Sequence, residues 1–196
     1  MQKKSEKIKS LVLDILLILN IMFIIIISGK YIYDRVEFEK MVKELDSGNL
    51  WSSTYTPLDD FEYYIEGNQI YIREYIGDDY KIKLSDNYRI EGKTCHIVSI
   101  DKPYTMLKNA RSVLIPDGVV TLGNSHYEPY EGAETMFIYL PGTLEQILGN
   151  FWNCFVNLKK VYYGGSKEKW NELTSDMALP ENVLIEFNVS EAGRST

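Results

Sequence analysis

Three patterns of hydrophobic and polar residues follow one another along this chain. The first is a nearly continuous apolar run over residues 11–28, LVLDILLILNIMFIIIIS, whose polar positions are Asp14, Asn20 and Ser28. A helix of this length would extend about 27 Å, close to the ~30 Å hydrocarbon core of a bilayer. A buried core helix would show an amphipathic period, which this run lacks. The pattern therefore predicts a transmembrane helix.

The charges beside this run predict its orientation. Lysines dominate the residues before it, whereas basic and acidic residues are mixed just after it. Because positive charge accumulates on the cytoplasmic side, residues 1–10 are predicted to form a cytoplasmic tail and residues 30–196 to lie outside the cytoplasm. A cleaved signal peptide is the competing interpretation, but the run is long and no A-x-A-like site follows it, which favours an uncleaved signal anchor. Asn20 could support weak dimerisation through the span.

The second pattern has the period of a helix. Apolar residues recur at the spacing i, i+3, i+4, i+7, namely Phe38, Met41, Val42 and Leu45. This spacing is typical of one apolar helix face. We therefore expect residues 29–48 to form a juxtamembrane helical stalk that packs on the following domain or pairs with another copy. Residues 49–60 form a linker.

The third pattern is an alternation with period two, which begins at about Phe61. Apolar residues alternate up to Ile65, a Glu66-Gly67-Asn68 turn follows, and the alternation resumes at Ile70. This predicts a β-hairpin. Further short strands are predicted at residues 80–84, 96–100, 112–115, 136–140, 160–163 and 183–187. No long amphipathic helix separates them, so the domain over residues 61–196 is expected to be mainly β rather than a doubly wound α/β fold.

An internal repeat of about 23 residues refines this expectation. Counted from Leu140-Pro141, apolar residues fall at offsets 4, 7, 11, 12, 15, 18, 21 and 23. Counted from Ile115-Pro116, the first five of these offsets hold Val119, Leu122, His126, Tyr127 and Tyr130. After two additional residues, the last three positions hold Thr135, Ile138 and Leu140. A repeat with L-x-x-I-x-L near its end is typical of a leucine-rich solenoid, here about three coils with caps at both ends.

Several segments resemble the BspA-type leucine-rich repeat. Two features of this family are present in LIPDGVVTLG and YLPGTLEQILGNFWNCFVNLKKVYYGGSKEKWNEL. Its units begin with I-P-x-x-V-x-x-I-G. Its last coil leads into a Y-x-G-x-x-x-x-W closing stretch, matched here by Tyr163, Gly164, Gly165 and Trp170. Residues 63–100 are similar to its opening cap, with Leu84-Ser85 at the place of the I-P pair. The resemblance covers about residues 61–187 and departs at residues 124–132, where we expect a bulged coil. It implies a bacterial, surface-exposed, non-catalytic recognition module, often used in adhesion.

The repeat also predicts a binding surface. Residues between the inward positions of each strand face outward, and these are Lys81 and Lys83, Ser112 and Leu114, Phe137 and Tyr139, Lys160 and Tyr162. In stacked strands they would form an exposed apolar and aromatic patch flanked by lysines, suited to protein or glycan binding. The candidate ligand-binding residues are Leu114, Phe137, Tyr139, Lys160 and Tyr162. The alternative is that the stalk or residues 49–60 cover this face.

Charge and composition exclude other functions. The net charge of −7 and the pI near 5.0 argue against nucleic-acid binding. Cys95 and Cys154 fall in coils too far apart for a disulfide, so both are predicted to be buried and reduced. Neither His96 nor His126 has a nucleophile beside it, and calcium-loop, P-loop and HExxH motifs are absent. We therefore expect no catalytic residue, cofactor or metal site, and solvated turns at the acidic pairs Asp59-Asp60 and Asp78-Asp79.

Together these patterns predict a single-pass membrane protein that carries a small solenoid outside the cytoplasm. The leading function is non-catalytic recognition or adhesion at the cell surface, through the outward face of the solenoid sheet. The alternative is a structural or regulatory subunit of a membrane complex, docked through its stalk, its span and the same face. An enzyme is the third class, and no constellation of residues supports it.

Overall fold

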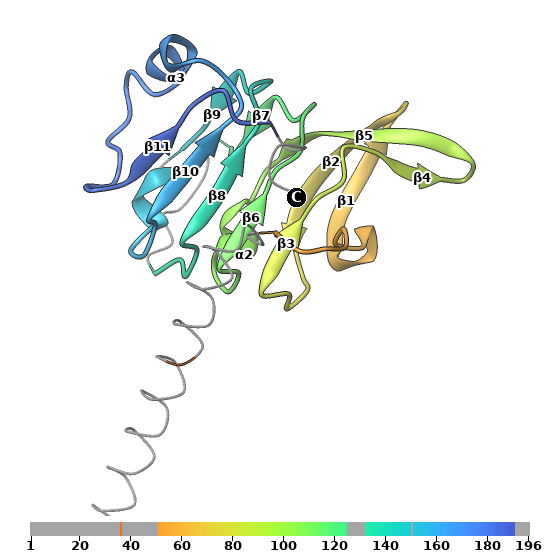
Figure 1. Ribbon diagram of the computed structural model, residues 1–196. Coiled ribbons are helices and arrows are strands. Elements are labelled where there is room, and N and C mark those ends of the chain that lie inside the picture. The colour runs from red at the N-terminus through yellow and green to blue at the C-terminus, as the bar shows by residue number, and fades with distance from the viewer. Residues whose placement is uncertain (1–35, 37–50, 125–131, 150, 191–196) are drawn as a thin grey trace, which may run out of the picture. The chain divides into compact units, whose positions relative to one another are not determined.

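The structure is a computed structural model that describes residue 36 and residues 51–124, 132–149 and 151–190 (Figure 1). The chain divides into two compact units, Met1–Ser47 and Gly48–Thr196. In the first unit Val36 is helical and exposed. The predicted span over residues 11–28 lies outside the described residues, as does most of the predicted stalk. Within the part of the chain that is described, no helix has the length and hydropathy that a bilayer crossing requires.

The second unit is built from short strands and a few helical turns. It begins with η1 (Leu58–Asp60) and the predicted hairpin. The strands are β1 (Phe61–Glu66), β2 (Gln69–Tyr75), β3 (Lys81–Lys83), β4 (Tyr88–Ile90), β5 (Lys93–Ile100), β6 (Ser112–Leu114), β7 (Thr121–Leu122), β8 (Phe137–Leu140), β9 (Gln146–Ile147), β10 (Lys160–Tyr163) and β11 (Leu184–Glu186). The helices are α2 (Tyr104–Leu107), η2 (Phe151–Cys154) and α3 (Lys167–Leu173).

These strands form two sheets, which Figure 1 shows as two rows of arrows. The hairpin sheet has the order β1-β2-β5-β7-β9, with β4 paired to β5. The repeat sheet has the order β11-β10-β8-β6-β3 and is parallel throughout. Apart from the β4–β5 hairpin, the chain alternates between the two sheets from β2 to β10, so each passage through both sheets completes one coil. The mainly β solenoid that the repeat predicts is confirmed by this topology.

The strand register follows the repeat. Ile138 of β8 pairs with Val113 of β6 on one side and with Val161 of β10 on the other. Leu122 and Ile147, the two residues at offset 7, pair in the hairpin sheet. The two additional residues of the earlier unit therefore lie between β7 and β8. The bulge expected at residues 124–132 falls largely outside the described residues.

Aliphatic side chains of the two sheets form one core. Two inward rows, one from each sheet, are fully or almost fully buried; they are Ile82, Val113, Ile138 and Val161 in the repeat sheet and Ile72, Ile100, Leu122 and Ile147 in the hairpin sheet. Burying one such side chain contributes about 1.5–3 kcal/mol. A single coil would leave one side of its row exposed, so the stacking of coils supplies the stability.

Two non-leucine positions of the repeat show how tightly the coils stack. Thr135 replaces a repeat leucine, and its buried hydroxyl donates to the carbonyl groups of Leu107 and Ala110 at 2.9 and 2.7 Å. Gly123 has a φ of 81°, and a Cβ there would collide with the carbonyl oxygen of Leu148 in the next coil. Glycine at this position is therefore required both by its backbone conformation and by the close approach of the two coils.

Both ends of the solenoid are closed. The antiparallel hairpin β1–β2 covers the first coil. At the other end Ser166 begins α3 as its N-cap, accepting the N–H of Lys169 at 3.3 Å, and Trp170 is buried against the rings of Trp152, Tyr163 and Phe187. The closing stretch that the sequence singled out therefore has a packing role.

Some local features do not follow from the repeat. The hairpin β4–β5 was missed because its turn residues Glu91 and Gly92 are not the usual Asn-Gly or Asp-Gly pair, although both adopt positive φ as a two-residue hairpin turn requires. Cys95 and Cys154 are buried and free, as predicted. The thiol of Cys154 lies 3.0 Å from the carbonyl oxygen of Phe151.

Candidate functional site

The outer face of the repeat sheet brings the predicted binding residues together. Leu114 pairs with Tyr139, and Tyr139 pairs with Tyr162, so these three side chains form one outward row across β6, β8 and β10. Phe137 and Lys160 also pair directly and belong to the neighbouring outward row. None of these side chains contributes to the core between the two sheets. The predicted juxtaposition and outward orientation are confirmed.

The predicted exposure of this face is wrong. The exposed fraction is only 1% for Leu114, 9% for Phe137, 2% for Tyr139 and 4% for Tyr162. The ring of Trp51 meets Tyr139 and Tyr162 edge-on, with centroids 6.5 and 5.9 Å apart. Trp51 is itself 8% exposed. The physical reason is that apolar outward side chains lose unfavourable contact with water when a segment of the same chain packs on them.

We call residues 51–57, which approach the repeat sheet, the covering segment. Its other end is held at β3, where the N–H of Thr56 donates to the carbonyl of Lys83 at 2.8 Å and the hydroxyl of Thr56 accepts the N–H of Lys83 at 3.2 Å. The carbonyl of Thr56 accepts the hydroxyl proton of Tyr88 at 3.0 Å. Since β3 is the edge strand of the repeat sheet, these bonds also satisfy backbone groups that the edge would otherwise present. Covering by residues 49–60 was the alternative that the sequence left open.

Two of the lysines that flank the face, Lys160 and Lys83, contact neighbouring side chains. Lys160 Nζ lies 2.6 Å from the carboxylate of Glu186 and 4.6 Å from the ring centroid of Tyr162. Lys83 Nζ lies 4.6 Å from the ring centroid of Tyr55 in the covering segment. Cation–π contacts and partly exposed ion pairs of this kind contribute about 0.2–1 kcal/mol each. The lysines therefore hold neighbouring side chains in position as well as carrying charge.

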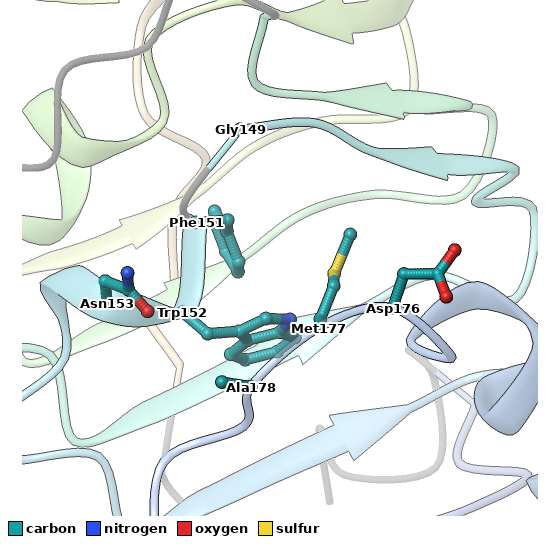
Figure 2. A pocket seen from close by; sticks show the side chains of 7 residues that line it. All are labelled: Gly149, Phe151, Trp152, Asn153, Asp176, Met177 and Ala178. Atoms are coloured by element: carbon teal, nitrogen blue, oxygen red, sulfur yellow. The ribbon is translucent and has the colours of Figure 1, made fainter.

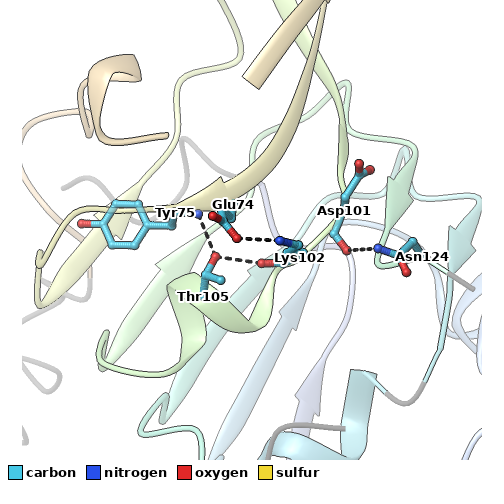
Figure 3. A network of polar contacts seen from close by, with 6 residues as sticks. All are labelled: Glu74, Tyr75, Asp101, Lys102, Thr105 and Asn124. Atoms are coloured by element: carbon cyan, nitrogen blue, oxygen red, sulfur yellow. Dashed lines mark hydrogen bonds and ion pairs between the residues drawn. The ribbon is translucent and has the colours of Figure 1, made fainter. Parts of the chain in front are cut away.

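A polar network on the hairpin-sheet side has a structural role (Figure 3). Thr105 of α2 accepts the N–H of Tyr75 at 2.7 Å and donates to the carbonyl of Lys102 at 2.8 Å. Lys102 pairs with Glu74 at 2.7 Å, and this hydrogen bond raises the pKa of Lys102. The amide of Asn124 donates to the carbonyl of Asp101 at 3.3 Å. These contacts join β2, the end of β5 and α2, and they arrange no nucleophile beside a base.

In each of the acidic pairs Asp59-Asp60 and Asp78-Asp79 the first residue is exposed and the second is half-buried. Asp60 and Asp79, one from each pair, line a single cavity of about 400 Å³ together with the hydroxyl-bearing residues of the covering segment. The ring of Tyr75 lies nearby, and its hydroxyl oxygen accepts the N–H of Asp79 at 2.8 Å. Burial, with the charges of Asp79, Asp60 and Asp78, raises the pKa of Tyr75 to about 12 although that hydrogen bond opposes the rise. Among the described residues no group of three or more His, Cys, Asp or Glu side chains is arranged to hold a metal ion.

The histidines considered from the sequence are not brought together with a nucleophile in the described region. His96 is exposed, and its Nδ1 lies 3.2 Å from the carbonyl oxygen of Asp86. His126 lies outside the described residues. Sequence reasoning missed the role of Trp51, whose signal was a tryptophan within residues 49–60, the linker named as one possible cover of the predicted aromatic patch.

Comparison with known proteins adds the following. No family model matches the chain, and no curated protein matches its sequence significantly. Its structure is similar to a leucine-rich repeat protein of T. pallidum, with a TM-score of 0.46 and 21% identity over 72% of this chain and 67% of that one. It is also similar to a leucine-rich cell surface protein of Faecalibacterium prausnitzii, with a TM-score of 0.41 and 14% identity over 67% of this chain and 38% of that one. The solved structures that it resembles are thus leucine-rich repeat proteins of bacteria.

Proposed function

We propose that this chain is a non-catalytic recognition module of the BspA type, displayed outside the cytoplasm on a membrane anchor formed by residues 11–28. Its ligand is a protein segment or a glycan, bound at the outer face of the repeat sheet. The binding residues are Leu114, Phe137, Tyr139, Lys160 and Tyr162. In this proposal the covering segment occupies the binding face and a ligand replaces it.

The contact of Trp51 with the face carries this proposal. An aromatic side chain of the covering segment already packs edge-on against Tyr139 and Tyr162, which identifies the kind of group that the face accepts. A ligand with an aromatic ring, or a sugar with an apolar face, can use the same two tyrosines. Because the covering segment competes, the apparent affinity equals the intrinsic affinity reduced by the fraction of open molecules. Clustering of copies on a cell surface would offset this reduction.

The near-complete burial of the same face favours a second candidate function. Tyr139 is 2% exposed, and its hydroxyl donates to the carbonyl of Val189 at 3.3 Å, so the chain holds this ring from two sides. A face closed in this way suits a structural or regulatory subunit of a membrane complex, docked through residues 11–48. The two functions differ in whether the covering segment can leave the face.

The test uses the full chain in mild detergent and a fluorescent peptide WSSTYTP that copies the covering segment. Trp51→Ala should bind the peptide more tightly than the unaltered chain, because the competing tryptophan is gone. Adding Tyr139→Ala and Tyr162→Ala should abolish that binding. Val156→Ala, at an exposed apolar position, is the matched control and should behave like the unaltered chain.

The variants of the chain that bind the peptide are then screened against arrays of surface glycans and purified surface proteins. A ligand that binds Trp51→Ala more tightly, competes with the peptide and is lost with the two tyrosines supports recognition at this face. Equal peptide binding by all variants would overturn the proposal. The subunit function would then be tested by cross-linking the intact chain in its membrane.

A further inference from the structure

A cavity at the closing end of the solenoid is separate from the covered face. It has a volume of about 260 Å³ and is lined by Gly149, by η2 residues and by the segment 176–178 that follows α3 (Figure 2). Ligand pockets for drug-sized molecules span roughly 300–1,000 Å³, so this cavity suits a single small group or sugar residue. No residue of the covered face lines it.

Trp152, which lines this cavity, carries a buried hydrogen-bond donor without a partner. Its side chain is 3% exposed, and its buried Nε1 has no hydrogen-bond partner. Figure 2 shows this nitrogen on the side of the indole ring toward Met177. A buried donor without an acceptor costs free energy that an incoming acceptor would recover.

The indole ring also has room to adjust. A second cavity of about 70 Å³ adjoins Trp152 and is lined by apolar residues, among them Trp170 of the closing stretch and Leu179 and Pro180 after α3. Met177 is flexible, half-buried and unbranched, so it can change rotamer without breaking a hydrogen bond. A small shift of these two side chains would bring the N–H to the larger cavity.

The other lining residues define the chemistry of the ligand. The carboxylate of Asp176 accepts hydrogen bonds and disfavours anions, while the amide of Asn153 can donate or accept. Phe151, Met177 and Ala178 provide apolar contact. A fitting ligand is therefore neutral, with a carbonyl acceptor for Trp152, a small apolar group beside it and hydroxyl donors for Asp176.

We propose that this cavity binds an acetamido sugar residue, with the acetamido oxygen on Trp152 Nε1, the acetyl methyl group on Met177 and Ala178, and a ring hydroxyl on Asp176. The sugar can be a free monosaccharide or the end of a longer glycan, since both present the same groups. This site is independent of the function proposed for the repeat sheet.

Tryptophan side-chain resonances provide a direct test, because the chain has three tryptophans and therefore three indole N–H signals. The full chain in mild detergent is labelled with ¹⁵N-tryptophan, and Trp152→Phe identifies the Trp152 signal by its loss. Millimolar N-acetylglucosamine should shift that signal and leave the Trp51 signal unchanged. Glucose, which lacks the acetamido group, should shift neither. The N-acetylglucosamine trimer shows whether a chain end binds better than the free sugar.

Variants separate this site from a general packing effect. Trp152→Phe keeps an aromatic ring, smaller than the indole, but removes the donor. Asp176→Ala removes an acceptor. Each should weaken binding by about fivefold or more in saturation-transfer measurements. Glu145→Gln, at an exposed position just before β9, is the matched control and should bind like the unaltered chain.

The site would be excluded if the Trp152 signal stayed fixed at saturating sugar or if glucose shifted it equally. An equal shift with N-acetyllysine amide would show that the hydroxyl groups are not recognised, which overturns a sugar site. An exchange cross-peak between the indole proton and water, unchanged by sugar, would show that the donor binds water only. None of these outcomes depends on Trp51 or on the repeat-sheet face.

Discussion

The outer faces of the two sheets differ in composition and in exposure. On the hairpin sheet, paired residues form a polar outward row at partly or fully exposed positions, namely Tyr71, Ser99, Thr121 and Gln146. On the repeat sheet, the corresponding row of Leu114, Tyr139 and Tyr162 is apolar or aromatic and buried, and Trp51 packs on its two tyrosines. An outward apolar row on a small domain thus indicates a covering element as readily as a binding surface.

The largest expected effect tests whether the two inward rows form one core. Ile138→Ala in the repeat sheet and Ile100→Ala in the hairpin sheet should each lower the free energy of unfolding by about 2–5 kcal/mol, because both side chains are fully buried. Denaturant titration followed by fluorescence and by circular dichroism measures the loss. Separate transitions for the two sheets would contradict a common core.

A matched pair of tyrosines tests the contrast between the outer faces. Tyr139→Ala should cost about 3 kcal/mol, since it removes a buried ring that contacts Trp51. Tyr71→Ala should cost about 1 kcal/mol, because Tyr71 is only half-buried and stacks on Tyr64 at 4.8 Å. Urea unfolding measures both losses. Equal losses would mean that covering by Trp51 adds no stability.

Alkaline titration tests the buried hydroxyl at the end of β2. The pKa of Tyr75 is about 12 in the folded chain, above its ordinary value of 10.0. The stabilisation that the folded chain gains from keeping this phenol neutral is therefore complete below pH 10 and is lost as the pH rises toward 12. The loss of stability between these pH values should be smaller in Tyr75→Phe. Because the pKa values of Tyr64, Tyr88 and Tyr163 are also raised, the difference absorbance of ionised phenols should show several late titrations, and Tyr75→Phe should remove the one near pH 12. An unchanged titration curve in the variant would assign that step to another tyrosine.

The smallest effects are expected at two ion pairs, one beside each sheet. Lys102→Met and Lys160→Met remove pairs with Glu74 and Glu186 that are partly exposed. Each should cost less than about 1 kcal/mol and should be weakened by salt. Thermal unfolding at low and high ionic strength measures the difference. A loss of several kcal/mol for Lys160→Met alone would show that the cation–π contact with Tyr162 dominates.

Much of the architecture could be predicted because the hydrophobic period is a local property. The spacing of Val113, Ile138 and Val161 fixed three strands of the repeat sheet and their register, since a one-residue slip would expose each of them. The hairpin β1–β2 was equally accessible from its turn and alternation. The hairpin β4–β5 was not, because its turn uses Glu91 in a conformation that the sequence pattern rarely signals.

The candidate sites were predictable only in part. The strand period places Tyr139 and Tyr162 side by side, but it carries no information about a residue almost a hundred positions earlier in the chain that covers them. Trp152 was found as a repeat position, and its inward packing is confirmed. Its unpaired nitrogen and the approach of Asp176 depend on how the closing stretch folds back, which no local period encodes.

The sequence by itself therefore determined the mainly β solenoid, its parallel repeat sheet with the register, and the face to which the repeat-sheet residues point, because these follow from the repeat and from the need to bury every inward row. The second sheet, with its short strands β7 and β9, was not predicted. Only the tertiary structure decided which faces meet water. Exposure depends on contacts between residues far apart in the chain, such as Trp51 on Tyr162 and Thr56 on Lys83. Such contacts form when the apolar area that they bury outweighs the entropy of ordering the segment, a balance that depends on three-dimensional shape rather than on spacing.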